Sequence, residues 1–162
     1  MAVDMFLNLS GGIEGESKDK TKTKEMDILA FSWGLSQSGT RHLGTGGGAG
    51  KCNVQDISLT KYIDKASAKI AQACALGTHI DSAVLTVRKA GGDDPVEYLV
   101  YTLTDCLVTS YTTGGSGGED RLTENLTLNF AICQFEYKGQ DGKGIGANAG
   151  NFGYNIPENA KV

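Results

Sequence analysis

One segment of the sequence has the composition of a phosphate-binding loop. Residues 44–52 read GTGGGAGKC, in which a lysine follows a run of glycines. A P-loop requires Gly, four residues and then Gly-Lys-Ser/Thr, because its backbone cradles phosphates and its final hydroxyl ligates magnesium. Here the first required glycine falls on Thr45, Cys52 replaces the hydroxyl, and the next residues alternate like a strand instead of opening a helix. The sequence therefore predicts no nucleotide site, and we expect no cofactor.

Acid–base chemistry has few candidate residues. His42 and His79 lie far apart in the sequence, and neither has a sequence neighbour that would orient it as a general base. One charged cluster consists of Glu119, Asp120, Arg121 and Glu124. This cluster could act as an acid pair, but an ionic loop or an interface latch is the preferred interpretation. The one GxSxG match, GGSGG at 114–118, lies in a predicted glycine-rich loop and not on the strand-to-helix turn that a nucleophile elbow requires. We therefore expect a protein that is not an enzyme and has no catalytic residues.

The cysteines do not have the spacing of a metal site. They are widely separated, form no CxxC pair and have no neighbouring histidine: Cys52, Cys74, Cys106 and Cys133. Because of this spacing we expect no metal site. We also expect no disulfides, because the chain is expected to be made in the reducing cytoplasm. The four thiols are interpreted as small hydrophobic residues of the core or of an interface.

Composition and charge exclude several other classes of protein. The chain has 162 residues, 40% hydrophobic and 21% charged, which is typical of one globular domain over residues 1–162. Its net charge is −4, and the short basic stretch 18–24 is interpreted as a solvated loop, so nucleic acid is not an expected partner. No apolar run is long enough for membrane insertion, and the N-terminus does not resemble a signal peptide. Any export would therefore use a route that reads no ordinary signal sequence.

The elements that would position these residues are mostly strands. Alternating hydrophobicity and flanking turn residues predict strands over 3–9, 26–36, 54–62, 83–89, 95–101 and 126–132. The two strands around residues 90–94 form a predicted β-hairpin, whose second arm continues to Tyr111 through a bend or bulge. In the last strand the alternation slips by one residue, which predicts a β-bulge near 133–134. The region from Gly139 is a predicted tail that Phe152 could dock.

A single helix is predicted at about residues 67–76. Ser67 is its candidate N-cap, and Gly77 can adopt the left-handed conformation that ends a helix. Two glycine-rich segments, 38–51 and 112–119, are predicted to be long loops. Several strands with one flanking helix and long glycine-rich loops indicate a mostly-β fold, a two-sheet β-barrel or sandwich.

The predicted strand 26–36 has two unlike faces. Its large apolar residues fall on one face: Leu29, Phe31, Trp33 and Leu35. Its small residues fall on the other: Ala30, Ser32, Gly34 and Ser36. Such a strand is half-buried. The small face is either an ordinary solvent face or a smooth wall toward a channel or a partner, and this strand alone does not decide between the two.

Longer runs of residues resemble a known family. The start MAVDMF, GESKDKTK at 15–22, LAFSWGLSQSG at 29–39 and GGSGGEDRLTENLTLNF at 114–130 are similar to Hcp, the haemolysin-coregulated protein family. GGGAGK, VQDISLTKYIDKAS and TVRKAGG are similar as well. The resemblance covers nearly the whole chain up to Tyr137 and weakens from Gly139 onward. Two residues depart from the common pattern: Phe31, where Trp is frequent, and Leu76, which replaces a small residue.

The resemblance implies a fold and a function. Hcp proteins are tube subunits of the bacterial type VI secretion system, each a two-sheet barrel with one flanking helix. The implied assembly is a homohexameric ring with a wide channel. Stacked rings form the inner tube, which a contractile sheath surrounds and expels and a spike protein caps. Small secreted effectors are implied to bind in the lumen, where the ring protects them. The implied localisation is cytoplasmic before firing and extracellular afterwards.

The resemblance also suggests residues for each surface. Residues 29–35 match the family strand of the lumen wall, which makes Ser32 the best candidate lumen residue, with Ala30 beside it. The same match turns Phe31 and Trp33 toward the barrel core. Candidates for the ring or stacking interface come from the two glycine-rich loops: Gly46, Gly47, Gly48, Ser116, Glu119, Asp120 and Arg121.

Two other functions stay open from the sequence. One is a monomeric β-barrel module that binds a small ligand or a glycan in a concave aromatic pocket. The other is an enzyme, such as a hydrolase that uses Glu119 or Asp120. A toxin domain fused behind an Hcp barrel is not expected, because the chain ends soon after the predicted barrel.

Overall fold

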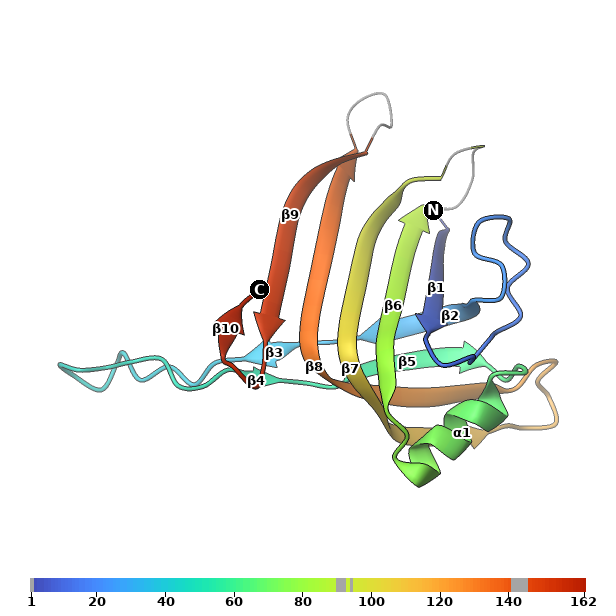
Figure 1. Ribbon diagram of the computed structural model, residues 1–162, viewed down its shortest axis with the longest axis horizontal. Helices are drawn as coiled ribbons and strands as arrows, with labels where there is room; N and C mark the ends of the chain where they lie inside the picture. The colour runs from blue at the N-terminus through green and yellow to red at the C-terminus, as the bar shows by residue number, and fades with distance from the viewer. Residues whose placement is uncertain (1, 90–92, 94, 141–145) are drawn as a thin grey trace.

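Two layers of β-strands, one upright and one lower, form the fold (Figure 1). The computed structural model describes residues 2–89, 93, 95–140 and 146–162. The elements are β1 (Val3–Leu9), β2 (Met26–Ser32), β3 (Leu35–Ser36), β4 (Asn53–Val54), β5 (Ile57–Tyr62), α1 (Ser67–Leu76), β6 (Ile80–Lys89), β7 (Glu97–Gly114), β8 (Thr123–Gln140), β9 (Gly146–Asn155) and β10 (Ala160–Lys161). The mostly-β barrel with one helix, as expected from the sequence, is confirmed.

The two layers share strands. The sheet order is β10-β9-β8-β5-β2-β1-β6-β7, and an additional pairing of β7 with β8 closes the barrel. Both β7 and β8 bend and run through both layers (Figure 1). The first part of β8 pairs with β5 up to Leu128, and its last part pairs with β9 from Ile132 onward. The lower sheet consists of β2, β5, the first part of β8 and the last part of β7. The upright sheet consists of β1, β6, β9, the first part of β7 and the last part of β8.

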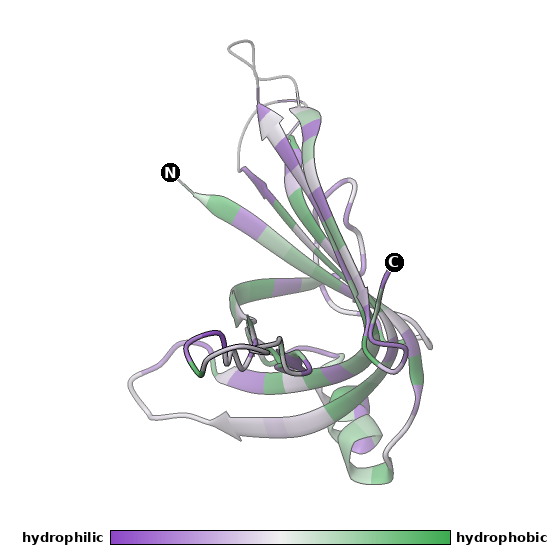
Figure 2. Cartoon of the chain, turned by 90° about the vertical axis from the view of Figure 1, so that its left-hand side faces the viewer, coloured by the Kyte–Doolittle hydropathy of each residue, from purple (hydrophilic) through white to green (hydrophobic). Residues whose placement is uncertain are grey.

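The hydrophobic core lies between the two layers. In β5, Ile57, Leu59 and Lys61 are buried, while the intervening Ser58 and Thr60 are half-exposed. Figure 2 shows hydrophobic and hydrophilic residues alternating along the strands, as a two-layer β fold requires. All four cysteines are free thiols, and those of β7 and β8, Cys106 and Cys133, are buried in the core. For these two residues the interpretation as small core hydrophobes is confirmed.

Aromatic side chains fill the part of the core nearest to β9. Phe31 and Trp33 pack edge-on against Tyr101, with ring centroids 5.6 and 5.8 Å apart. Phe152 stacks on Phe135 at 5.1 Å. The predicted inward orientation of Phe31 and Trp33 is thus confirmed, as is the docking of the C-terminal region by Phe152. That region is not a plain tail, however, because its residues form β9 along the edge of β8.

The predicted strand 26–36 is interrupted. The register between β2 and β5 shifts between Ile28 and Ala30, and the strand stops at Ser32 before β3 begins. As a result Leu29 and Leu35 are 41% and 44% exposed, so the prediction that they share the buried face is wrong. The bulge removes Leu29 from the alternation on which that prediction relied.

The irregularity predicted within the long strand β7 is confirmed, whereas the bulge predicted in β8 is not at its predicted place. In β7, Asp105 has a φ of 58°, and the register of the strand against β8 shifts between Val108 and Ser110. The predicted bulge at 133–134 is wrong, because the register of β8 shifts between Tyr137 and Lys138 instead. The slip in alternation arises because β8 bends from one layer into the other (Figure 1). The hairpin β6–β7 is confirmed, although most of its turn at 90–94 lies outside the described residues.

Of the two caps predicted for helix α1, the C-terminal one is confirmed and the N-terminal one is wrong. Gly77 has a φ of 63° and caps the C-terminus, as predicted. Ala66, not Ser67, is the N-cap residue, so that prediction is wrong. The Ser67 hydroxyl instead accepts a hydrogen bond from the Asp64 N–H at 3.0 Å and donates to Glu124 at 2.8 Å.

Among the residues that the structure describes, no helix has the length and hydropathy needed to span a bilayer.

Candidate assembly and lumen surfaces

The outward face of the lower sheet carries short polar side chains. Strand pairing places Ser32 opposite Ser58, which is opposite Thr127, and Thr127 is opposite Ser110. One step along the strands, Ala30, Thr60, Asn125 and Thr112 form a parallel row. All eight are exposed or half-exposed, and we call them the polar face: Ala30, Ser32, Ser58, Thr60, Ser110, Thr112, Asn125 and Thr127. The polar face therefore crosses all four strands of the lower sheet.

Four side chains of the polar face form hydrogen bonds with one another in two pairs. The Thr60 hydroxyl donates to the Asn125 amide oxygen at 2.6 Å, and the Thr127 hydroxyl lies 2.7 Å from that of Ser110. No member of the polar face carries a charge. A nearby carboxylate, Asp56, accepts hydrogen bonds from Thr109 and Asn129, each at 2.8 Å. Such a surface offers hydrogen bonds to another molecule without selecting for its charge.

The sequence identified two of these residues and missed six. Ala30 and Ser32 both lie on the polar face, as the strand pattern allowed. The other six come from β5, β7 and β8, where alternating hydroxyls look like any solvent-facing row. Their shared register is set by pairing between segments up to about 70 residues apart, which local periodicity does not report.

A long arm projects from one end of the lower sheet (Figure 1, left). The arm comprises residues 35–54, beginning with the β3–β4 pair and continuing into the glycine-rich segment. Every residue from Leu35 to Lys51 is exposed. The Thr40 hydroxyl donates to the Gly48 carbonyl at 3.1 Å and accepts from its N–H at 3.2 Å, which holds the two sides of the arm together. The arm is thus an ordered projection with few contacts to its own barrel.

The three glycines proposed as interface residues lie on this arm. Gly46 has a φ of 105°, which favours glycine. A Cβ atom on Gly47 would lie 2.7 Å from the Thr40 carbonyl oxygen, whereas one on Gly48 would meet nothing within 4 Å. Gly46 and Gly47 are therefore explained by the shape of the arm itself. Their contact with a second molecule stays a prediction.

The other four proposed interface residues lie at the opposite end of the lower sheet. Ser116, Glu119, Asp120 and Arg121 are exposed in the loop between β7 and β8. The Arg121 guanidinium carbon lies 4.0 Å from the centroid of the Tyr62 ring, which is cation–π geometry. Glu124 does not belong with them, so the predicted four-residue surface cluster is wrong. Glu124 is the second residue of β8 and points into the core.

Glu124 is part of a buried polar network. Glu124 and Lys61 are both completely buried and form an ion pair. The Lys61 amine also donates to Asp64 at 2.9 Å. The Glu124 carboxylate accepts from the Ser67 and Tyr111 hydroxyls. Burial and the bond to Glu124 raise the pKa of Tyr111 to about 12, so this phenol stays a donor at neutral pH. The network joins α1, β5, β7 and β8 beneath the polar face.

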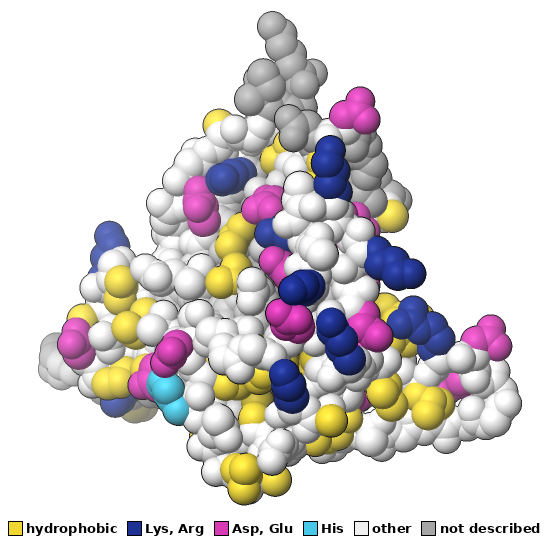
Figure 3. All heavy atoms as spheres, turned by 45° about the vertical axis from the view of Figure 1, so that its right-hand side comes forward, with side chains coloured by type: hydrophobic (Ala, Val, Ile, Leu, Met, Phe, Trp, Pro, Cys, Tyr) yellow, Lys and Arg dark blue, Asp and Glu magenta, His cyan; other side chains and the backbone are white. Residues whose placement is uncertain are grey.

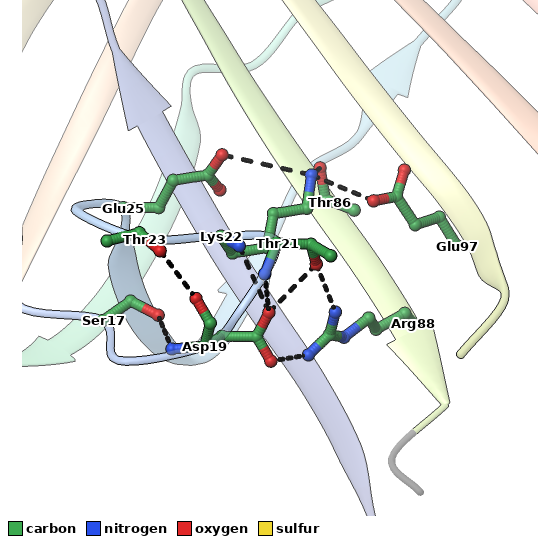
Figure 4. Close-up of polar contacts among 9 residues, drawn as sticks. All are labelled: Ser17, Asp19, Thr21, Lys22, Thr23, Glu25, Thr86, Arg88 and Glu97. Carbon is green, nitrogen blue, oxygen red and sulfur yellow. Dashed lines mark hydrogen bonds and ion pairs between the residues drawn. The ribbon is translucent and has the colours of Figure 1, made fainter. Parts of the chain in front are cut away.

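A second polar cluster fastens the loop before β2 to the upright sheet (Figure 4). Asp19 forms an ion pair with Arg88 of β6 and accepts hydrogen bonds from the Thr21 and Lys22 N–H groups. The hydrogen bond from Arg88 is the main cause of the fall in the pKa of Asp19 from 3.8 to about 2. Lys22 pairs with Glu97 at 3.0 Å. The basic stretch 18–24 is therefore an anchored loop and only partly solvated.

The histidines do not form a recognisable catalytic set. His42 is exposed on the arm. His79 lies between Asp81 and Asp105, 2.9 Å from each, so it has spatial partners that its sequence neighbours alone did not reveal. All three side chains are more than half exposed. No group of three or more His, Cys, Asp or Glu side chains in the described part of the chain is placed to hold a metal ion.

Comparison with known proteins identifies the family. Residues 6–137 match the sequence profile of the family described as "Type VI secretion system effector, Hcp". This chain belongs to the Hcp family. This Hcp is 57% identical over 165 aligned residues to Protein hcp1 of Pseudomonas aeruginosa, and the alignment covers 100% of both chains. The resemblance found in the sequence is thus confirmed, and Hcp proteins are structural proteins of type VI secretion.

Solved structures of Hcp proteins have the same fold. One, described as the structure of a type six secretion system protein, is 30% identical with a TM-score of 0.92 and covers 99% of this chain and 100% of its own. Hcp1 from Salmonella typhimurium is 36% identical with a TM-score of 0.80, and the match covers 100% of both chains. These matches extend through β9 and β10, beyond the residues that the family profile covers.

Proposed function

We propose that this Hcp is a non-enzymatic structural subunit, folded as one domain, whose homohexameric rings stack into the inner tube of a type VI secretion system. The observation that carries the proposal is the polar face. A sheet that buries apolar residues on one side and presents eight short, uncharged side chains on the other suits the wall of a wide channel. The aromatic side chains support this choice over a monomeric glycan-binding module, because they pack on one another in the core.

The open edges of the lower sheet support assembly into a closed ring. On one side, β1 pairs with β2 only at Met26 and Asp27, so Ala30 to Ser32 pair with β5 alone. On the other side, β7 pairs with β6 only as far as Cys106, and its residues from Leu107 onward pair with β8 alone. Unpaired strand edges invite pairing with another chain. Two unlike edges on one subunit fit the head-to-tail contacts of a cyclic ring.

The proposed partners are the molecules that a tube of stacked rings would contact. A second copy of the chain would complete the ring, and a spike protein and a contractile sheath would contact the tip and the outside of the tube. Small secreted effectors would contact the polar face in the lumen, with Ser32 and Ala30 among the contacting residues. Weak hydrogen bonds repeated around a ring can retain cargo that a single site would release. The subunit would be cytoplasmic before firing and secreted with the tube afterwards.

The first test of this proposal is the mass of the native particle. We expect the purified protein to form a ring about six times heavier than the 17.0 kDa chain, since heterologous contacts close only when all subunits are in place. Native mass spectrometry at micromolar concentration measures this mass directly, and negative-stain images would show the central opening. A particle that remains monomeric under these conditions would argue against the proposed function.

The second test enlarges a side chain on the polar face. Ser32→Gln should reduce co-purification of effectors with the ring and leave the ring mass unchanged, because glutamine extends from an exposed position into the proposed lumen. Thr78→Gln, at another exposed position after α1 and outside the polar face, is the matched control and should change neither quantity. Rings that fall apart in the Ser32 variant would place Ser32 in an interface instead of the lumen.

A further inference from the structure

We propose that β9 and β10 form a lid that opens while the rest of the barrel stays folded, and that opening frees the edge of β8 for a strand of another chain. The lid comprises residues 146–162. It lies along one side of the upright sheet, with β9 beside β8 and β10 near the end of the chain (Figure 1). Because the lid belongs to the single subunit, it does not depend on the ring proposed above.

The sequence of the lid gives it little hold of its own. Eight of the ten residues of β9 are Gly, Ala or Asn, which are poor strand formers. None of the ten is buried, and Ala147 to Asn151 are all exposed. Residues 146–156 carry no charge. This part of the lid therefore has no side chain that could form an ion pair and no row of buried apolar residues.

Backbone pairing holds the lid mainly along one edge. β9 pairs with β8, although the register of this ladder shifts between Tyr137 and Lys138. On its other edge β9 pairs with β10 only at Tyr154 and Asn155. β8 is also paired with β7, from Thr123 to Tyr137, so it would keep its place if the lid left.

Phe152 and Ile156 anchor the lid to the core. Phe152 stacks on Phe135, with ring centroids 5.1 Å apart, and lies 5.9 Å from Trp33. Ile156 packs against the core, and its N–H donates to the Ala131 carbonyl at 2.9 Å. Both anchors are only half-buried. A segment with few buried contacts and exposed backbone hydrogen bonds opens more readily than the core, so the lid should open as a unit.

The surface beneath the lid has the features of a strand-binding site. Opening would leave one edge of β8 unpaired from Ile132 to Gln140, and unpaired strand edges invite pairing with another chain. The Trp33 indole nitrogen is buried there and, among the residues that the structure describes, has no hydrogen-bond partner. A buried donor without a partner is uncommon in proteins. The closed lid therefore leaves one group that an incoming chain could satisfy.

The lid itself indicates which chain would fit. It is an extended, uncharged segment that places one aromatic ring, Phe152, against the core. A partner strand of the same chemistry would gain its affinity from the main chain of β8 and its specificity from that aromatic position. Figure 3, which brings the side with β1 and the loop before β2 forward, shows Lys, Arg, Asp and Glu side chains spread over that face. The uncharged lid differs from it.

Hydrogen exchange measures the opening directly. In the purified protein, amides of β9 should exchange at least about 100-fold faster than those in the ladder between β7 and β8, because they open locally. Their exchange should change little with denaturant, since local opening exposes far less surface than unfolding. β9 amides that exchange as slowly as this ladder, with the same denaturant dependence, would show that the lid does not open on its own.

Removing one anchor should favour the open state. Phe152→Ala should raise exchange in β9 by about 10-fold or more, because the aromatic stacking that holds the lid is lost. Asn151→Ala, at the exposed neighbouring position, is the matched control and should change this exchange by less than about 2-fold. Equal acceleration in the two variants would contradict the anchoring role of Phe152.

A cross-strand disulfide should hold the lid closed. Glu136 and Asn151 are directly opposite on β8 and β9, and opposed residues of antiparallel strands have the Cα separation that a disulfide requires. In the double variant Glu136→Cys/Asn151→Cys, oxidation should abolish the fast exchange of β9. Reduction of the same protein is the matched control and should restore it.

A peptide tests whether the uncovered site accepts a strand. The probe is a fluorescently labelled synthetic peptide with the sequence of residues 146–162, and anisotropy measures its binding to the full chain. Phe152→Ala should bind the probe at least about 10-fold more tightly than the wild type, because its lid competes less. A probe that itself carries Phe152→Ala should bind more weakly, and the oxidised double variant should bind neither probe until it is reduced.

The outcomes separate the lid from the proposed function. Probe binding that survives oxidation, or that does not need the Phe152 ring, would overturn the strand-binding site, as would a failure to bind in every variant. Slow exchange in β9 would overturn the lid and leave the ring proposal intact. The native mass of the same sample decides the ring separately, so a monomer with a fast-exchanging β9 would overturn the ring and support the lid.

Discussion

Replacing Lys61 with methionine is expected to lower the free energy of unfolding by about 3–5 kcal/mol, because Glu124 would become a buried charge without its partner. Both side chains are 0% exposed. The Ser67 and Tyr111 hydroxyls would still donate to the Glu124 carboxylate, but they cannot neutralise it. Chemical unfolding measures the change, and all variants must be compared at one protein concentration because assembly adds to apparent stability.

A second substitution distinguishes charge burial from loss of packing. Adding Glu124→Gln to Lys61→Met should recover much of the lost stability, because an uncharged amide keeps an acceptor for the Ser67 and Tyr111 hydroxyls. Lys65→Met is the matched control, since the Lys65 side chain is 52% exposed, and it should change stability by less than about 0.5 kcal/mol. A double variant whose loss equals the sum of the single losses would show that the pair is not coupled.

Asp19→Asn is expected to lower the free energy of unfolding by about 2 kcal/mol, the usual contribution of a hydrogen bond to a charged group. The Arg88 side chain is 6% exposed and would lose the Asp19 carboxylate with which it pairs (Figure 4). The Asp4 carboxylate, 3.8 Å away, would remain. The loop before β2 should then open more often, which hydrogen exchange at the Thr21 and Lys22 amides would detect. Unchanged exchange and unchanged stability in this variant would contradict the role assigned to Asp19.

The lowered pKa of Asp19 also predicts how stability depends on pH. The pKa of Asp19 falls from 3.8 to about 2 on folding, so the folded state favours its ionised form. The stabilisation is therefore complete above pH 3.8, declines as the pH falls, and is lost below about pH 2. Unfolding measured between these values should depend less on pH in Asp19→Asn than in the wild type. Asp81→Asn, at an 86% exposed side chain, should leave the pH dependence nearly unchanged.

Local sequence patterns predicted those parts of the fold that depend on near neighbours. The strand 3–9, the helix and its Gly77 cap follow from periodicity and from one residue's backbone preference, and the structure confirms them. The face assignment of Leu29 failed because a bulge at Ile28–Ala30 depends on how β2 meets β5. β9 was missed because Gly, Ala and Asn have low strand propensity, and its pairing with the edge of β8 supplies the order instead.

The candidate surfaces were predictable only in part, because local alternation does not report how distant strands pair. Ser32 and Ala30 lie on one strand, so alternation places them on one face. Lys61 and Glu124 are 63 residues apart, and charged residues at alternating strand positions look the same whether they face water or a buried partner. Glu124 was therefore grouped with Arg121, its near neighbour in sequence. The register between β5 and β8, which pairs Lys61 with Glu124, is set by the whole barrel.

The passage of β7 and β8 through both layers has a mechanical consequence. A load applied along the lower sheet is carried to the upright sheet by two continuous backbones, so the layers cannot slide past each other by yielding at side-chain contacts alone. Relative movement would require bending both strands where they pass between the layers, and the ladder that joins them, from Leu99↔Tyr137 to Gly114↔Thr123, stiffens them against this bending. We therefore expect the subunit to respond to an axial push as one stiff body, and to transmit the push instead of absorbing it.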